Sequence, residues 1–141
     1  MMRVFLDANI LFSASMPKSR VGLLVQVAEY KATLLTNLYA AEEARRNLES
    51  KSRASLPAFE QLLRRCEIIG ERSIPVSIDI APKDIPILGG AIAGNASHLL
   101  TGDERDFGAL FGKTIQGVAI VSPYLFGVEL VQRKWLKKRD K

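Results

Sequence analysis

Short apolar runs alternate along the chain with longer segments whose apolar residues recur at helical spacing. The runs at residues 4–6, 32–36, 97–101 and 118–121 are rich in Val, Ile, Leu and Phe. We predict them to be strands, with the first and third buried on both faces. The segments between the runs, judged by caps, apolar spacing and helix-forming residues, predict helices at 10–14, 19–28, 38–51, 55–66, 84–94, 104–111 and from about 124 to the basic end.

The order of these elements defines the fold class. Strands that alternate with helices of this length need crossover connections, which produce a mainly parallel sheet. We therefore predict a single α/β/α sandwich, formed by one domain over residues 1–141. Residues 74–80 alternate around Pro75, and both a short edge strand and an extended connector fit them.

The charge of the chain favours a polyanionic partner. Twenty Lys and Arg against fifteen Asp and Glu give a net charge of +5. Arg45 and Arg46 lie on a predicted helix, and a basic helix end or tail covers residues 133–141, with Lys137 and Lys138 in it. These residues are candidates for contacts with nucleic-acid phosphates, although a solvated helix end explains the tail equally well.

Neither a membrane span nor an export signal is predicted. No apolar run approaches the ~20 residues that cross a bilayer, and Asp7 interrupts the short apolar segment at the N-terminus. Cys66 is the single cysteine, so an intrachain disulfide is excluded and a cysteine metal site is not expected. We expect a cytoplasmic protein.

Carboxylates follow two of the predicted strands. Asp7 comes directly after residues 4–6, and Asp103 comes after residues 97–101, with Asp106 one helical turn further on. The carboxyl ends of parallel strands meet at one edge of the sheet, where open α/β folds bind their ligands. Each aspartate taken alone could equally cap the helix that follows it. Their joint occurrence predicts an acidic site.

Two further segments can bring acids to this edge. Asp84 opens a predicted helix, and Glu42 and Glu43 lie in the first turns of another. Asp84 could be only a helix cap, and the glutamates could simply pair with Arg46 on a solvated face. Three or four close carboxylates need a cation to hold them together. A set of oxygen ligands favours Mg²⁺ or Mn²⁺ over zinc, and such ions activate water for phosphodiester hydrolysis.

At this point the sequence resembles the PIN-domain nucleases over nearly its whole length. The resemblance lies in five segments: LDANIL at 6–11, EARRNL at 43–48, DIPIL at 84–88, LTGDERDF at 100–107 and GVAIVSP at 117–123. The TGD segment together with the upstream Asp84 is the most specific part. This resemblance implies a PIN-like fold and a metal-dependent ribonuclease.

The resemblance also implies roles for individual residues. The acidic catalytic positions of the family match Asp7, Glu43, Asp84 and Asp103. Glu43 is preferred to Glu42 because it has the family's spacing before Leu48. The metal ligands implied are Asp7, Asp84 and Asp103; the auxiliary residues are Asn9, Thr101 and Asp106.

Partners are implied by the same resemblance. Many PIN-domain nucleases are VapC-type toxins of type II toxin–antitoxin pairs, and these are usually homodimers inhibited by an antitoxin protein. A catalytically degenerate PIN fold that binds RNA or assembles with other proteins is the alternative. A haloacid-dehalogenase phosphatase is disfavoured because Asn9 stands where its second Asp is needed, and a receiver domain fits less well still. His98 and Cys66 are predicted to be core residues.

Overall fold

The fold is built around one six-stranded sheet. The computed structural model describes residues 1–70 and 75–137. The strand order is β3-β2-β1-β4-β6-β5, and all neighbours pair in parallel except β5, which runs antiparallel to β6. The strands are β1 (Arg3–Leu6), β2 (Thr33–Asn37), β3 (Glu67–Ile69), β4 (His98–Leu100), β5 (Thr114–Ile115) and β6 (Val118–Val121).

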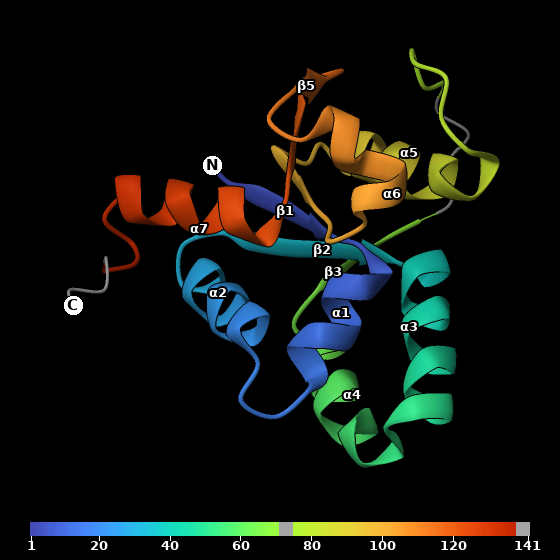
Figure 1. The fold of residues 1–141 in the computed structure, drawn as a ribbon, viewed down its shortest axis with the longest axis vertical. Coiled ribbons are helices and arrows are strands. Elements are labelled where there is room, and N and C mark those ends of the chain that lie inside the picture. The colour runs from blue at the N-terminus through green and yellow to red at the C-terminus, as the bar shows by residue number, and fades with distance from the viewer. Residues whose placement is uncertain (71–74, 138–141) are drawn as a thin grey trace.

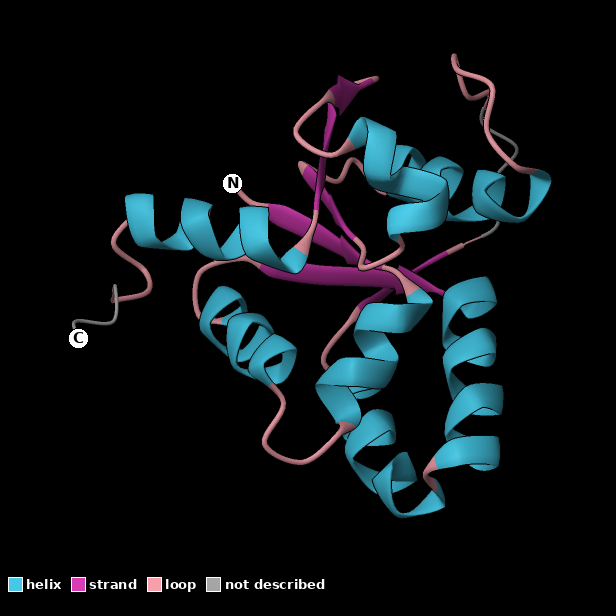
Figure 2. Ribbon diagram, viewed as in Figure 1, coloured by secondary structure: helices cyan, strands magenta, loops and turns pink. Residues whose placement is uncertain are grey.

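Helices cover both faces of this sheet. Figure 1 shows α1 to α4 on one face and α5 and α6 on the other, with α7 packed beside α2; Figure 2 shows the same three layers by type of element. The chain thus has an α/β/α fold. The helices are α1 (Ala8–Ser15), α2 (Arg20–Glu29), α3 (Leu38–Lys51), α4 (Leu56–Arg64), α5 (Ile85–Ala93), α6 (Glu104–Phe107) and α7 (Pro123–Gln132), with 3-10 turns η1 (Arg53–Ser55), η2 (Pro82–Asp84) and η3 (Gly108–Leu110).

The local sequence explains where several helices begin. Ser19 Oγ accepts the N–H of Gly22, and Asn37 Oδ1 accepts the N–H of Ala40, so each caps the first turn of its helix. Between the helical layers, β1 and β4 are almost entirely buried, which is why they are continuous apolar runs. No helix within the described residues is long and apolar enough to cross a membrane.

The structure departs from the predicted elements in three places. Two short strands that were not predicted, β3 and β5, form the two edges of the sheet. Residues 75–80 form a connector, which was one of the two predicted alternatives; in it Gln116 Oε1 accepts the N–H of Ser77, and Gln116 Nε2 donates to Pro75 O. Residue 74 lies outside the described residues. The predicted helix at 104–111 is a four-residue helix and a 3-10 turn.

The third departure concerns the basic end. The last helix stops at Gln132 and does not continue to the basic end. The N–H groups of Trp135 and Leu136 both donate hydrogen bonds to Leu130 O, and Lys134 adopts a φ of 63°. The chain therefore leaves the helix axis. Arg133 to Lys137 therefore follow the helix as a turn.

Candidate metal centre

The ends of β1 and β4 lie side by side. Leu6 is the register partner of Leu100, and Asp7 N–H continues the pairing with a 3.1 Å bond to Leu100 O. This places Asp7 beside Thr101 at the carboxyl edge of the sheet. The predicted convergence of these two strand ends is confirmed.

Asp7 is held by hydrogen bonds from three neighbours. Its Oδ1 accepts the N–H of Ala8 at 2.6 Å, so Asp7 does cap α1. Its Oδ2 accepts the hydroxyl of Thr101 at 2.8 Å and the amide of Asn9 at 3.3 Å. Burial nevertheless raises the pKa of Asp7, and the charges of Glu43 and Asp103 add to this rise.

Thr101 and Asn9 tie the two strand ends together. The hydroxyl oxygen of Thr101 accepts the N–H of Asp103 at 3.1 Å while its proton goes to Asp7. Asn9 Oδ1 accepts the N–H of Gly102 at 2.7 Å. Both polar side chains therefore set the position of Asp7 relative to the turn that carries Asp103.

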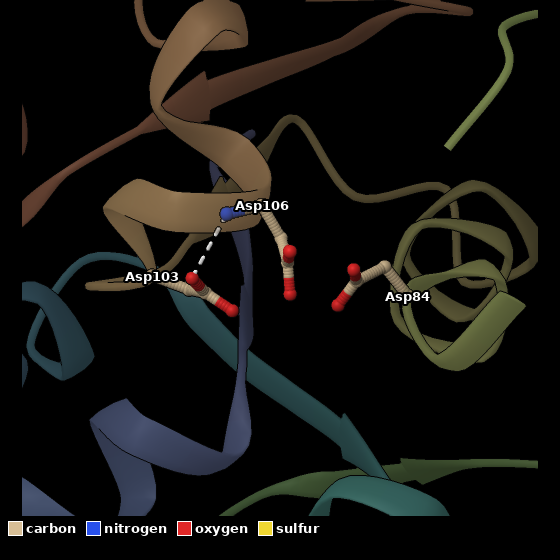
Figure 3. Close-up of side chains that lie close together, drawn as sticks. All are labelled: Asp84, Asp103 and Asp106. Carbon is tan, nitrogen blue, oxygen red and sulfur yellow. Dashed lines mark hydrogen bonds between the residues drawn. The ribbon is translucent and has the colours of Figure 1, made fainter. Parts of the chain in front are cut away.

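Three acids converge in front of this edge. One carboxylate oxygen from each of Asp84, Asp103 and Asp106 lies within 4.8 Å of the other two. Figure 3 shows Asp103 and Asp106 extending from α6 toward Asp84, which comes from the chain at the start of α5. Asp103 also caps α6, because its Oδ1 accepts the N–H of Asp106 at 3.0 Å. This triad includes Asp106, for which the resemblance to PIN-domain nucleases implied only an auxiliary role. It does not include Asp7 or Glu43.

Asp84 is the most unusual member of the triad. It stands at the N-cap position of α5, yet its side chain makes no cap hydrogen bond. Only 6% of the residue is exposed, and its Oδ2 has no hydrogen-bond partner among the described residues. Burial raises the pKa of Asp84 to about 7, with Asp106 and Asp103 contributing. The interpretation of Asp84 as a helix cap alone does not explain this arrangement.

One lysine ammonium reaches the triad. Lys83 Nζ lies 2.9 Å from Asp106 Oδ2, and the lysine side chain is 65% exposed. This contact lowers the pKa of Asp106. Lys83 was not among the predicted site residues, although its position directly before Asp84 was a signal that it would lie near that acid.

The triad fits a hard divalent cation. It offers oxygen donors alone, and the buried, unpartnered oxygen of Asp84 is the kind of atom that a cation satisfies. The softer donors lie elsewhere: Cys66 bonds Leu62 O, and burial raises its thiol pKa to about 12. His98 is buried between Ser97 and Glu129, at 2.8 Å from each, as a core residue.

A solved structure shares this fold. One chain in the crystal structure of VapBC2 from Rickettsia felis, bound to a DNA fragment from their promoter, matches with a TM-score of 0.60. The match covers 86% of this chain and 98% of that chain at 18% identity. The fold is PIN-like. At this identity the likeness concerns the fold alone, and neither a protein-family model nor a curated protein matches the sequence.

The remaining candidates lie around the triad or away from it. Glu43 acts on Asp7 through its charge. Arg45 instead forms an ion pair with Glu60 at 3.2 Å and stacks on Phe59, joining α3 to α4. Arg46 and Lys137 are exposed, and Lys138 lies outside the described residues.

Proposed function

We propose that this protein is a metal-dependent ribonuclease that hydrolyses RNA phosphodiester bonds at the edge where β1 and β4 end. The observation that carries the proposal is a buried oxygen of Asp84 that has no hydrogen-bond partner within residues 1–70 and 75–137, in a carboxylate that faces two others on a PIN-like fold. An acidic cluster repels a phosphate unless a cation lies between them. The triad can therefore act on a phosphodiester only when it binds a metal ion.

Asp84, Asp103 and Asp106 would hold Mg²⁺ or Mn²⁺. When bound, such an ion neutralises charge on the phosphate and lowers the pKa of its water. Asp7 and Glu43 act as the further catalytic acids, and Asp7 extends the negative field toward Asp103. Thr101 and Asn9 fix the direction of the Asp7 carboxylate through the bonds described above. This assignment adds Asp106 to the metal ligands and keeps Asp7 beside them.

Basic side chains would position the RNA backbone. The chain carries a net charge of +5, and Arg46 and Lys137 present exposed charges that can meet phosphates. Lys138 continues the same basic end. Arg45 has a smaller part in this proposal because Glu60 already neutralises it.

We also infer that the chain acts as one domain and as the toxin of a type II toxin–antitoxin pair in the cytoplasm. Support comes from the solved structure of similar fold, which is a VapBC2 complex. The inferred partners are a second copy of this chain and an antitoxin protein. The degenerate RNA-binding or assembly module remains the second candidate, because Lys83 gives the triad a cation without any metal.

Incubation of a mixed pool of structured RNAs with the purified protein tests the proposal. Cleavage should require Mg²⁺ or Mn²⁺ and stop in EDTA. The Asp7→Asn/Asp103→Asn double variant should lose more than about a hundredfold in rate, since even outer residues of metal sites are worth 10–100-fold. Asn at position 103 can still cap α6, so the variant should keep its fold. RNA binding without cleavage in either metal would favour the degenerate module.

A further inference from the structure

The last helix, α7, is apolar on two opposite faces. Its inner face packs Phe126 and Leu130 into the core, where both are fully buried. Tyr124 and Val128 each precede one of these residues by two positions and so point to the opposite side of the helix. They are 78% and 37% exposed. A helix with one buried face normally carries polar residues on the other, so this outer face is unusual.

The outer face of α7 lines an open groove with a volume of about 710 Å³. Tyr124, Gly127 and Val128 lie in it, together with Leu136 from the turn after the helix. Gly127 allows α7 to lie close to α2, because a Cβ at this position would be 3.6 Å from Leu24 Cδ2. The floor of the groove is therefore mostly aliphatic, with one aromatic ring.

The turn after α7 is anchored where it lines the groove. Its Trp135 ring packs against two cations, with Lys31 Nζ 5.9 Å and Arg133 Cζ 5.3 Å from the ring centroid. The N–H groups of Trp135 and Leu136 are both bonded to Leu130 O, as described above. The groove is thus closed at this end by a held segment of the chain.

The charges that line the groove are positive. Arg20 and Lys137 are both exposed and line it, and among the described lining residues there is no Asp or Glu. Neither cation forms an ion pair within residues 1–70 and 75–137. Both charges are therefore available to a partner.

The two cations lie toward opposite ends of the groove. Figure 1 shows α2 and α7 side by side. Leu24 lies next to Gly127 and, further along both segments, Lys31 lies over Trp135, so the two helices run in the same direction. Arg20, one turn before Leu24, therefore lies toward the start of α7, whereas the lysine of the C-terminal turn lies toward the other end.

This arrangement distinguishes between possible occupants. A second copy related by twofold symmetry would bring the same cations into one interface, where they repel. RNA forms polar interfaces and leaves an aliphatic floor unused. A small anionic molecule with one charged end would meet only one of the two cations. A polypeptide with an apolar centre and acidic ends matches the whole groove.

We propose that this groove binds an amphipathic helical segment of a partner protein, with apolar side chains over Val128 and acidic side chains paired with Arg20 and Lys137. The inference goes beyond the ribonuclease proposal and does not depend on it. None of the residues that line the groove belongs to the candidate metal centre.

Selection from a displayed library of random peptides long enough to form a helix tests the proposal, with the full chain as bait. Enriched peptides should carry apolar residues flanked by Asp or Glu. One of them is labelled and titrated by fluorescence anisotropy against the unmodified chain, Val128→Glu and Arg20→Glu. Matched controls place Glu outside the groove: Leu38→Glu, at a side chain that is 56% exposed on α3, and Arg53→Glu, at an exposed arginine. Thermal melts verify that each variant folds.

Val128→Glu and Arg20→Glu should each weaken binding of the peptide by about tenfold or more, because each sets a like charge against an acidic partner. Leu38→Glu and Arg53→Glu should bind the peptide as the unmodified chain does. Arg20→Glu should prefer a version of the peptide in which Lys replaces the acids, which reverses the preference of the unmodified chain.

Failure to enrich such peptides, or binding that Val128→Glu and Arg20→Glu leave unchanged, would overturn the proposal. Conversion of a dimer to monomers by Val128→Glu would also overturn it and assign the groove to a second copy. Weaker binding of labelled RNA by Val128→Glu, with peptide binding unchanged, would assign the groove to RNA instead. Metal-dependent cleavage by the unmodified chain is measured separately, so each of these failures leaves the ribonuclease proposal standing.

Discussion

Lys83 Nζ lies 2.9 Å from Asp106 Oδ2, which makes this lysine the internal counter-ion of the acidic triad. The pair joins η2 to α6, two segments that approach from different sides of the site (Figure 3). A metal ion bound by the triad would contact the carboxylate of Asp106. The Lys83 ammonium contacts the same carboxylate. The two cations therefore compete for Asp106.

Removing the ammonium should strengthen metal binding and weaken the metal-free protein. Lys83→Met is expected to raise the affinity for Mg²⁺ about threefold, as expected for loss of one exposed ion pair. Its melting temperature in EDTA should fall slightly because three carboxylates then lack a cation. Isothermal titration and thermal melts measure the two effects, with Lys83→Arg as the control that keeps the charge. Weaker Mg²⁺ binding by Lys83→Met would show instead that the lysine positions Asp106 for the ion.

Asp84 should make the stability of the metal-free protein depend on pH. Its pKa in the folded chain is about 7, above the ordinary value of 3.8, so folding favours the protonated acid. Ionisation of Asp84 therefore costs the folded chain stability. This loss of stability is absent below about pH 4, grows as the pH rises, and is complete above about pH 7. Asp84→Asn, which cannot ionise, should therefore gain about 2 kcal/mol over the unmodified chain at pH 8 and little at pH 4.

Denaturant unfolding in EDTA at several pH values measures this difference. Saturating Mg²⁺ should reverse its sign at pH 8, because the unmodified chain then gains the binding energy of the ion. A stability difference that stays constant from pH 4 to pH 8 would mean that Asp84 ionises normally.

Thr101 should matter through its hydroxyl group alone. The residue is fully buried, and its oxygen serves both Asp7 Oδ2 and the N–H of Asp103. Thr101→Val keeps the shape, but it leaves the N–H of Asp103 without this acceptor and leaves Asp7 Oδ2 with only the longer hydrogen bond from Asn9. These losses should cost about 2 kcal/mol of stability. Cleavage should slow by about 10–100-fold. Thr101→Ser retains the hydroxyl and should stay within a few-fold of the unmodified chain; equal losses in Ser and Val would assign the effect to packing.

The sequence predicts the fold well where hydrophobic pattern and capping agree. The buried strands β1, β4 and β6 and the helix α3 lie where their patterns place them. The short strands β3 and β5 carry two or three residues each, too few for an alternating pattern to be visible. Their positions depend on neighbouring strands that no local pattern describes.

The sequence predicts those residues of the site that directly follow a strand. Asp7 and Asp103 follow two strands, so their approach was expected from the parallel sheet. The closeness of Asp106 to Asp84 was not, because it depends on how α6 packs against the start of α5. The position of Lys83 directly before Asp84 indicates only that it lies near that acid, and the tertiary structure is needed to show that its ammonium pairs with Asp106.

Titration of the protein with Mn²⁺ tests most directly whether the unpartnered oxygen of Asp84 faces a cation. Calorimetry is performed on the unmodified chain, Asp84→Asn, and Asp79→Asn, whose aspartate is exposed on the 75–80 connector. We predict that Asp84→Asn binds Mn²⁺ more than about tenfold more weakly, while Asp79→Asn binds Mn²⁺ like the unmodified chain. Equal Mn²⁺ affinity in all three proteins would contradict this prediction.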